Sequence, residues 1–376
     1  MKTLRRLIHR EILVTVAFVT LAFLALFSFF DLVEELGDVG RGNPANPYRL
    51  SHAALFALLW APNRLYEVLP IAVLIGSIIV MARFAQSSEF TILRTSGMGP
   101  WRALRTLLAL GIAFTVLTFA VGDYLAPVTT RTAQLLKAQF TGKITVGQTG
   151  AWLKEKQKFS NLAVNVASLS EGSVMRNIKI FEFNASGQMV SSIHADSGTF
   201  SNDASWLMQG VRRSEFFIHA DAAQPGKHGA HVQHDSIAKD YRWPTELNAE
   251  MVSVALLKPE RMSTVDLYQY TQHLQANSQS SQRFEIEFWR KVFYPLSCLV
   301  MVVLALPFAY LHFRSSSISG YVFMGVMIGI SFFLLNNVFG YAGNLNNWKP
   351  WISAAIPGLL YSLASLAAFG WLVLRH

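Results

Sequence analysis

The chain has 376 residues, 52% of them hydrophobic and 15% charged, and its mean hydropathy is +0.32. This composition is too apolar for a soluble globular protein. The net charge of +9 does not indicate a nucleic-acid partner, because no nucleic-acid-binding motif accompanies it and much of the charge lies in short loops, where it orients membrane proteins.

Apolar stretches of about 20 residues, the length that an α-helix needs to cross a bilayer, interrupt the chain six times. Basic residues precede the first stretch, as in a signal peptide. That stretch is long for a signal-peptide core and ends without a small-residue cleavage site, so we expect a retained helix. Cys298 is the single cysteine, which excludes a disulfide framework. The predicted spans are residues 12–30, 65–82, 104–121, 292–311, 321–339 and 351–374.

The short loops predict the orientation. Arginines are concentrated before the first span and between the second and third spans, whereas the arginines after the first span are diluted by Asp31, Glu34, Glu35, Asp38 and Glu67. Positive charge stays on the cytoplasmic side of a membrane. The bias therefore predicts that both termini are cytoplasmic and that the large insert between the third and fourth spans lies outside.

The insert, at about residues 141–262, has the texture of a β domain. Short alternating or β-rich runs such as 161–166, 178–183 and 215–218 are separated by turn residues. This pattern favours a sandwich, a jelly roll or a partial barrel. Residues 124–140, 266–277 and 282–291 are predicted helices that link this domain to the spans, so that residues 1–140 and 263–376 form the membrane part.

Catalytic motifs are missing from the sequence. Neither Gly142-Lys143 nor Gly226-Lys227 completes a phosphate-binding loop, and no G-x-S-x-G or H-E-x-x-H motif occurs. His228, His231 and His234 follow a Pro-Gly pair, which favours a polar loop over a metal site. We therefore predict no catalytic residue, no metal ligand and no cofactor in this chain.

The loop at residues 83–97 is more informative. Ser87 or Ser88 can cap a short helix, and Gly97 suits its C-terminus. Such an amphipathic helix beneath the bilayer is a surface that a cytoplasmic motor could bind, although it could also rest on lipid headgroups. The predicted coupling residues are Phe84, Glu89, Phe90, Leu93, Arg94 and Gly97.

Several motifs in order resemble one known family. They are the 85–97 run, Gly122-Asp123-Tyr124-Leu125-Ala126-Pro127, Trp289-Arg290-Lys291 followed by Tyr294-Pro295-Leu296, and Phe339-Gly340. Together with three spans on each side of a β domain, they resemble the LptF/LptG family of permease subunits, and the C-terminal half is closer to its LptG branch. The resemblance covers essentially the whole chain.

The resemblance implies an α-helical integral membrane protein with six spans and an inserted all-β periplasmic domain of the jelly-roll type. The location would be the inner membrane of a Gram-negative bacterium, and the activity would be lipopolysaccharide export by an ABC transporter. The implied partners are an LptF-like paralogue, an LptB-like ATPase dimer that binds ATP and Mg, and an LptC-like protein. Glu89 would take the acidic position of the coupling helix, and the first and fifth spans would form lateral gates.

A lipid cavity is expected along two stripes with i, i+4, i+7, i+11 spacing, which places their members on one helix face. The alternative is ordinary packing against lipid or neighbouring helices. Arg131 and Lys137, with Arg41, are the candidate headgroup-phosphate residues. The acidic run 31–38 departs from the family, whose LptG members often carry lysines there. The predicted cavity residues are Phe23, Phe27, Phe30, Glu34, Val326, Ile330, Phe333 and Asn337.

Three other classes of protein compete. A lipoprotein-releasing or MacB-like permease also joins spans to an extracytoplasmic domain, but it typically has four spans, with the domain after the first. A membrane-anchored enzyme would need a convergent set of catalytic groups. A third possibility, an envelope-assembly scaffold without transport, would not need the coupling helix.

Overall fold

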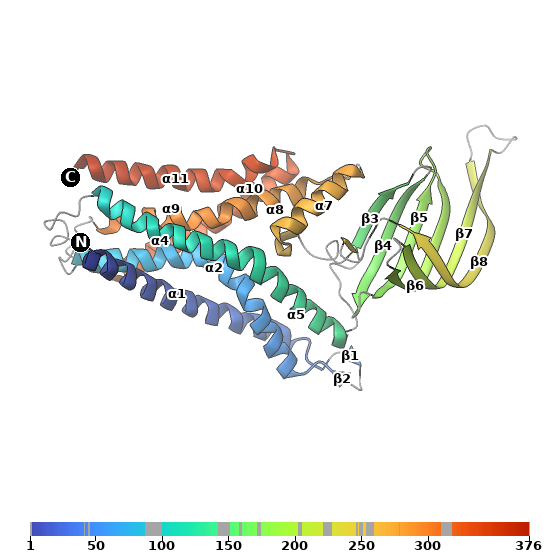
Figure 1. The fold of residues 1–376 in the computed structure, drawn as a ribbon, viewed down its shortest axis with the longest axis horizontal. Helices are drawn as coiled ribbons and strands as arrows, with labels where there is room; N and C mark the ends of the chain where they lie inside the picture. Colours follow the sequence, from blue (N-terminus) through green and yellow to red (C-terminus); the bar gives the residue numbers. More distant parts are fainter. Residues whose placement is uncertain are drawn as a thin grey trace.

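The computed structural model describes the chain over residues 2–40, 42–43, 46–86, 100–141, 151–157, 160–170, 174–201, 205–220, 228–245, 247, 251–252, 259–277, 279–309 and 318–375. Long helices form an elongated bundle, and a β-sheet stands at one end of it (Figure 1). The N-terminus and the C-terminus both lie at the opposite end. Among the described residues, six helical stretches are long and apolar enough to cross a membrane.

The first half of the bundle contains three of these stretches. Each helix runs beyond its predicted apolar core, because helical hydrogen bonding continues where the chain leaves the hydrocarbon. A five-residue π-helix, η1, joins two α-helices of the third stretch. The elements are α1 (Lys2–Leu36), the short pair β1 (Gly42–Asn43) and β2 (Asn46–Pro47), α2 (Leu50–Gln86), α4 (Pro100–Ala120), η1 (Val121–Leu125) and α5 (Ala126–Thr141).

The insert forms one six-stranded antiparallel sheet in which each strand pairs with its sequence neighbours, in the order β3-β4-β5-β6-β7-β8. The predicted strand runs lie in β4, β5 and β7, and the turn residues at 185–187 connect β5 to β6. The strands are β3 (Ala151–Lys156), β4 (Asn161–Ser170), β5 (Val174–Phe183), β6 (Met189–Ser201), β7 (Ser205–Ala220) and β8 (His228–Pro244).

The expectation of a loop at the histidine run is wrong. His228, His231 and His234 belong to β8, and each pairs with a residue of β7. Pairing between strands decides this conformation, because β7 is long enough to pair with β8 as far as His228.

The chain returns to the bundle through two helices outside the apolar core. The fourth span begins at Gln282 rather than near residue 292, and a 3₁₀ turn interrupts it at Tyr294–Leu296, where Pro295 lacks the amide that an α-helix requires. The elements are η3 (Pro259–Arg261), α7 (Thr264–Ala276), α8 (Gln282–Phe293), η4 (Tyr294–Leu296), α9 (Ser297–Leu304), η5 (Leu306–Ala309), α10 (Ile318–Leu345) and α11 (Pro350–Arg375).

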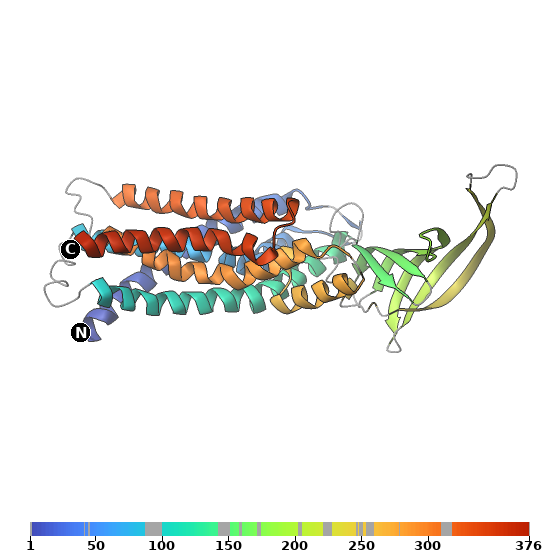
Figure 2. The ribbon, with the colours of Figure 1, turned by 90° about the horizontal axis from the view of Figure 1, so that it is seen from above.

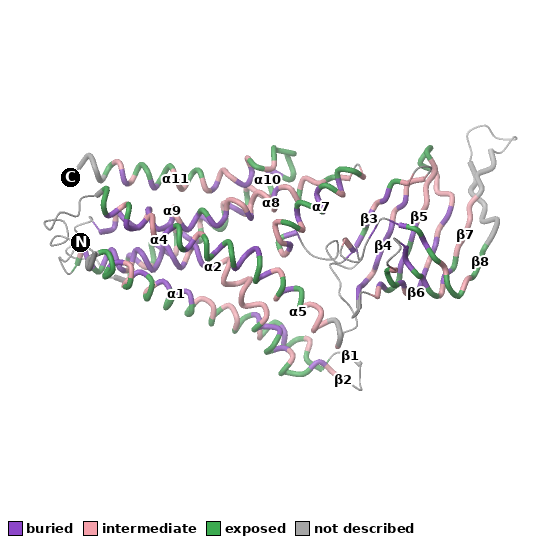
Figure 3. The backbone as a smooth tube through the Cα atoms, in the orientation of Figure 1, coloured by how far each residue is buried: buried purple, intermediate pink, exposed green. Residues whose placement is uncertain are grey.

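Helix α2 is the centre of the bundle. It packs against α1, α5, α9 and α10, and 78% of its apolar stretch is buried, against 22% in both α1 and α10. Seen from above, α10 and α11 run side by side along the bundle (Figure 2). The burial colours make the same contrast, with exposed residues following α1 and α11 along their length (Figure 3).

The sheet has its own hydrophobic core. Val164, Ile178 and Met208 from the strands are fully buried and pack in one cluster with Leu267 and Leu274 of α7. Phe284 and Phe288 of α8 pack against the same cluster. Because α8 continues into the fourth span, the sheet core and the membrane bundle share a helix.

Candidate functional site

The two predicted apolar stripes lie against the same helix. Phe23 and Phe27 of α1 and Val326 of α10 are partly buried against one cluster on α2, which contains Val68 and Ala72. The structure therefore brings together two stripes that are about 300 residues apart in the sequence. Between them, α2 supplies a common apolar surface.

Of the remaining stripe residues, Asn337 is half-buried and the other four are exposed. Phe30 is 56% exposed, Ile330 45% and Phe333 42%, and Glu34 is also exposed. Around them, α1 and α10 carry further large apolar residues that are exposed: Phe18, Leu21, Leu26, Phe29, Val33, Phe323, Met324, Met327, Leu334 and Val338. Apolar faces of this extent on two separate helices need lipid or another protein to cover them.

Charged residues lie where these faces end on the side of the sheet. Arg64 of α2 donates two hydrogen bonds to Asp31 of α1, at 2.6 Å and 3.0 Å, and a third to Glu67 at 3.0 Å. The guanidinium carbon of Arg64 also lies 5.8 Å from the ring centre of Phe27. The planar arginine fork suits two parallel bonds to one carboxylate, which fixes α1 against α2 at this point.

Lys137 of α5 forms the second charged cluster. Its ammonium lies 2.8 Å from a carboxylate oxygen of Glu35 and 2.8 Å from one of Asp38. Tyr48 donates a hydrogen bond to Glu35 at 3.2 Å, and its burial, together with the nearby Glu35 charge, raises the pKa of the Tyr48 hydroxyl. Lys137 is thus held between two carboxylates, while Arg131 on the same helix is exposed. The third predicted cation, Arg41, lies outside the described residues.

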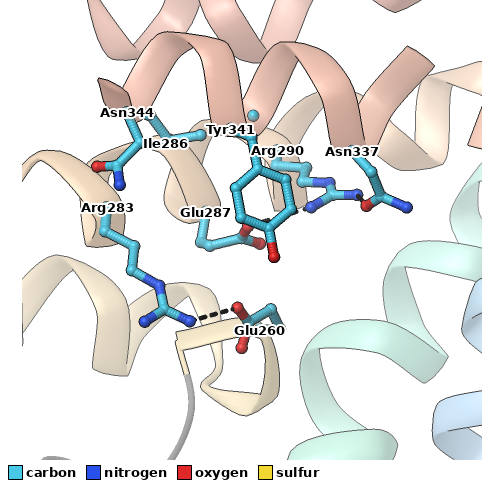
Figure 4. A pocket seen from close by; sticks show the side chains of 9 residues that line it. Glu260, Arg283, Ile286, Glu287, Arg290, Asn337, Tyr341 and Asn344 are labelled. Atoms are coloured by element: carbon cyan, nitrogen blue, oxygen red, sulfur yellow. Dashed lines mark hydrogen bonds and ion pairs between the residues drawn. The ribbon is translucent and has the colours of Figure 1, made fainter. Parts of the chain in front are cut away.

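A polar pocket lies where α8, α10 and η3 meet. Its volume is about 280 Å³. Figure 4 shows Arg283 reaching Glu260 on one side and Arg290 reaching Asn337 on the other, with Tyr341 in front. The bonds measure 2.8 Å from Arg283 to Glu260 and 2.7 Å from Arg290 to Asn337. Asn337, predicted to line a cavity, is therefore one wall of a charged pocket.

The arginines and glutamates of this pocket were missed by sequence reasoning. Glu287 and Arg290 are three residues apart on α8, and Arg290 donates to Glu287 at 3.1 Å. This spacing is the signal that could have found them, since residues at i and i+3 on a helix are neighbours. Nearby, the guanidinium of Arg261 lies 4.6 Å from the ring centre of Trp60, and burial lowers the pKa of Arg261.

At the other end of the bundle, the structure describes one of the six predicted coupling residues. Phe84, in the last turn of α2, is 4% exposed and packs in the main core cluster of the bundle. Its burial fixes the end of α2 against the rest of the bundle. Glu89, Phe90, Leu93, Arg94 and Gly97 lie outside the described residues, so their helix stays a prediction.

Comparison with known proteins agrees with this architecture. The sequence profile of the family described as lipopolysaccharide export system permease LptF/LptG matches residues 6–373. Two relatives, each named lipopolysaccharide export system permease protein LptG, come from Haemophilus influenzae and Escherichia coli K12. Both are 26% identical to this chain and cover 99% of it and 98% of their own length.

These relatives are named permease proteins, which fits a non-catalytic role for a chain with six apolar helices and an inserted sheet domain. The match extends over nearly all of both chains, so no large part of the architecture is left unaccounted for. The chain therefore belongs to the LptF/LptG family of lipopolysaccharide export system permeases.

Proposed function

We propose that this permease subunit forms one half of a lipid cavity that takes lipopolysaccharide from the outer leaflet of the inner membrane and passes it toward a periplasmic bridge. The observation that carries the proposal is the pair of exposed apolar faces on α1 and α10, both anchored on α2. The second half of the cavity would come from an LptF-like paralogue whose helices cover these faces.

The energetics require such a cavity. Each acyl CH₂ group moved from lipid into water costs about 0.8 kcal/mol, so extraction of a lipid with several chains costs tens of kcal/mol. A chamber lined by Phe30, Ile330 and Phe333 replaces the bilayer around those chains. Closing α1 and α10 toward the partner would then remove the apolar surface and expel the lipid.

The orientation follows from the same proposal. Both termini would be cytoplasmic and the sheet periplasmic, because the basic loops and the acidic first loop obey the positive-inside bias in this direction. The curved meander β3–β8 would be the described part of a jelly-roll-like domain that stands near an LptC-like protein. Its core helix α7 and the shared helix α8 would hold it over the cavity.

The energy would come from an LptB-like ATPase dimer that binds ATP and Mg and grips the coupling segment with Glu89. This chain would contribute no cofactor. For the headgroup, Arg131 is the exposed candidate, and Lys137 would contact phosphate only by exchanging one of its two carboxylate partners. Cations of the partner subunit or a divalent ion that bridges phosphate to Glu34 would complete the site.

Purification of the complex from detergent tests this function. We expect the chain to carry a paralogous permease, a cytoplasmic ATPase and bound lipopolysaccharide, and Glu89→Ala to weaken retention of the ATPase. Co-purification of lipoprotein in place of lipopolysaccharide would favour the lipoprotein-releasing class. A complex that hydrolyses ATP normally but neither holds nor moves lipopolysaccharide would contradict the proposal.

A further inference from the structure

Two sequence motifs that the cavity does not use meet at one place in the structure. The Gly122-Asp123 pair lies in the π-helix η1, directly after the predicted apolar residues 104–121 of the third span, and Lys291 lies in α8, directly before the predicted apolar residues 292–311 of the fourth. Lys291 Nζ donates a hydrogen bond to the Gly122 carbonyl at 3.1 Å, and the residue is only 7% exposed. A buried ammonium is costly unless it is bonded, so this contact fixes α8 on η1.

The next residue of the π-helix, Asp123, bonds to α7, the helix that packs in the sheet core. The Asp123 carboxylate, in a residue that is 9% exposed, accepts a hydrogen bond of 2.6 Å from the backbone N–H of Thr264. Thr264 is the first residue of α7, whose own cap is a separate box formed by Ser263 and Asp266. Asp123 is therefore an additional acceptor at the N-terminus of α7, where the helix dipole favours a negative charge.

The packing around Gly122 leaves no space for a side chain. A Cβ atom at this position would lie 2.2 Å from the ring of Tyr66 on α2. The ring centre of Tyr66 lies 5.0 Å from that of Tyr294, whose ring is tilted relative to it and whose hydroxyl donates to the Glu67 carbonyl at 2.6 Å. The π-turn and the missing side chain thus let η1 touch α2 directly while its carbonyl and the neighbouring carboxylate reach α8 and α7.

We propose that Asp123 and Lys291 are positioning residues for lipid transfer, which set the orientation of the sheet domain over the outward mouth of the bundle. This inference rests on the proposed function. Helix α7 carries Leu267 and Leu274 into the sheet core, so a bond to its first residue is a bond to the whole domain. In this proposal the contact of η1 with α7 and α8 is a joint. Movement of the fourth span reaches this joint through Lys291.

Thr264→Pro is the sharpest test, because it removes one N–H and little else. Thr264 is at the first helical position, where proline is favoured, and Ser263 before it already has the extended conformation (φ −71°, ψ 165°) that a following proline requires. The Thr264 hydroxyl has no hydrogen-bond partner among the described residues. Thr264→Val, which keeps the N–H, is the matched control.

The measurement uses the whole complex in proteoliposomes and counts lipopolysaccharide molecules released per ATP hydrolysed. We expect Thr264→Pro and Asp123→Ala to lower this ratio roughly two- to thirtyfold while ATPase activity and assembly persist, and Thr264→Val to match the wild type. Adding Thr264→Pro to Asp123→Ala should cause no further loss, since both remove the same bond. Lys291→Met should lower the ratio, and Lys291→Arg should recover part of it.

A second readout does not depend on lipid. Spin labels at Asp240 on β8 and Lys349 before α11, both exposed, report the distance between sheet and bundle after Cys298 is replaced by alanine. The joint predicts one narrow distance in the wild type and a broad distribution in Thr264→Pro. An unchanged distribution and an unchanged release ratio in Thr264→Pro would overturn the inference. A wild-type complex that releases no lipopolysaccharide would instead overturn the proposed function.

Discussion

Helix α2 and the pair α1 and α10 have similar hydrophobicity but opposite surroundings. In α2, 78% of the apolar stretch is buried inside the chain, whereas in α1 and α10 the share is 22%. Apolar residues of α2 are therefore used for packing within the subunit, and those of α1 and α10 remain for lipid or a partner. Hydropathy therefore finds a membrane-spanning helix, whereas packing distinguishes a helix that is buried within the subunit from one whose apolar face stays exposed.

The largest expected effect comes from a change on the exposed face of α10, which leaves the packing of the buried helix α2 intact. Phe333→Arg places a charge on the exposed face of α10, where burial against lipid chains is unfavourable for a cation. We expect loss of lipopolysaccharide export with normal assembly, measured by export in proteoliposomes and by crosslinking from a photoreactive group at Ile330. Leu363→Arg on the exposed face of α11 is the matched control, and equal loss in both variants would remove the special role of α10.

The next effect separates the two kinds of apolar residue by stability. Ile78 of α2 is fully buried and Phe323 of α10 is 67% exposed. Ile78→Ala should lower the free energy of unfolding by about 2–5 kcal/mol, because it leaves a cavity. Phe323→Ala should cost less than about 1 kcal/mol. Thermal unfolding of the purified subunit in detergent measures both, and similar losses would contradict the distinction.

A smaller effect concerns the ion pair between Arg64 of α2 and Asp31 of α1. Arg64→Met leaves the buried carboxylate of Asp31 without its partner, and we expect a loss of about 1–3 kcal/mol, since the pair is partly exposed. The double variant Arg64→Met with Asp31→Leu should recover much of it, because the buried carboxylate that lost its partner is removed as well. A double variant less stable than the single one would argue against this account.

The smallest effect tests a polar contact within the interior. The Thr118 hydroxyl of α4 lies 3.1 Å from the Cys298 sulfur of α9 and also donates to the Phe114 carbonyl of its own helix. Thr118→Val keeps the shape and removes a weak bond, so we expect a change below about 1 kcal/mol. An unfolding shift as large as that of Ile78→Ala would show that polar bonds, and not packing, hold α4 to α9.

The headgroup prediction shows where sequence reasoning stops. From the sequence alone, the acidic run 31–38 is a departure from the family. In the structure Asp31 faces Arg64, and Glu35 and Asp38 face Lys137. Lys137 is 102 residues from Glu35 in the chain, and no local spacing rule connects positions so far apart. The same limit explains why Arg283 and Glu260 were missed.

The sequence by itself determined the six spans, the β insert and the helices that return from it, because these depend on local hydrophobic length and alternation. The histidine run was misjudged because pairing with β7, a contact with another strand, decides its conformation. Tertiary structure alone decided which apolar helix is buried at the centre of the bundle and which carboxylates form ion pairs. It also decided that Lys291 bonds to the Gly122 carbonyl. Each of these is a contact between distant segments, and its energy depends on a neighbour that the local sequence does not contain.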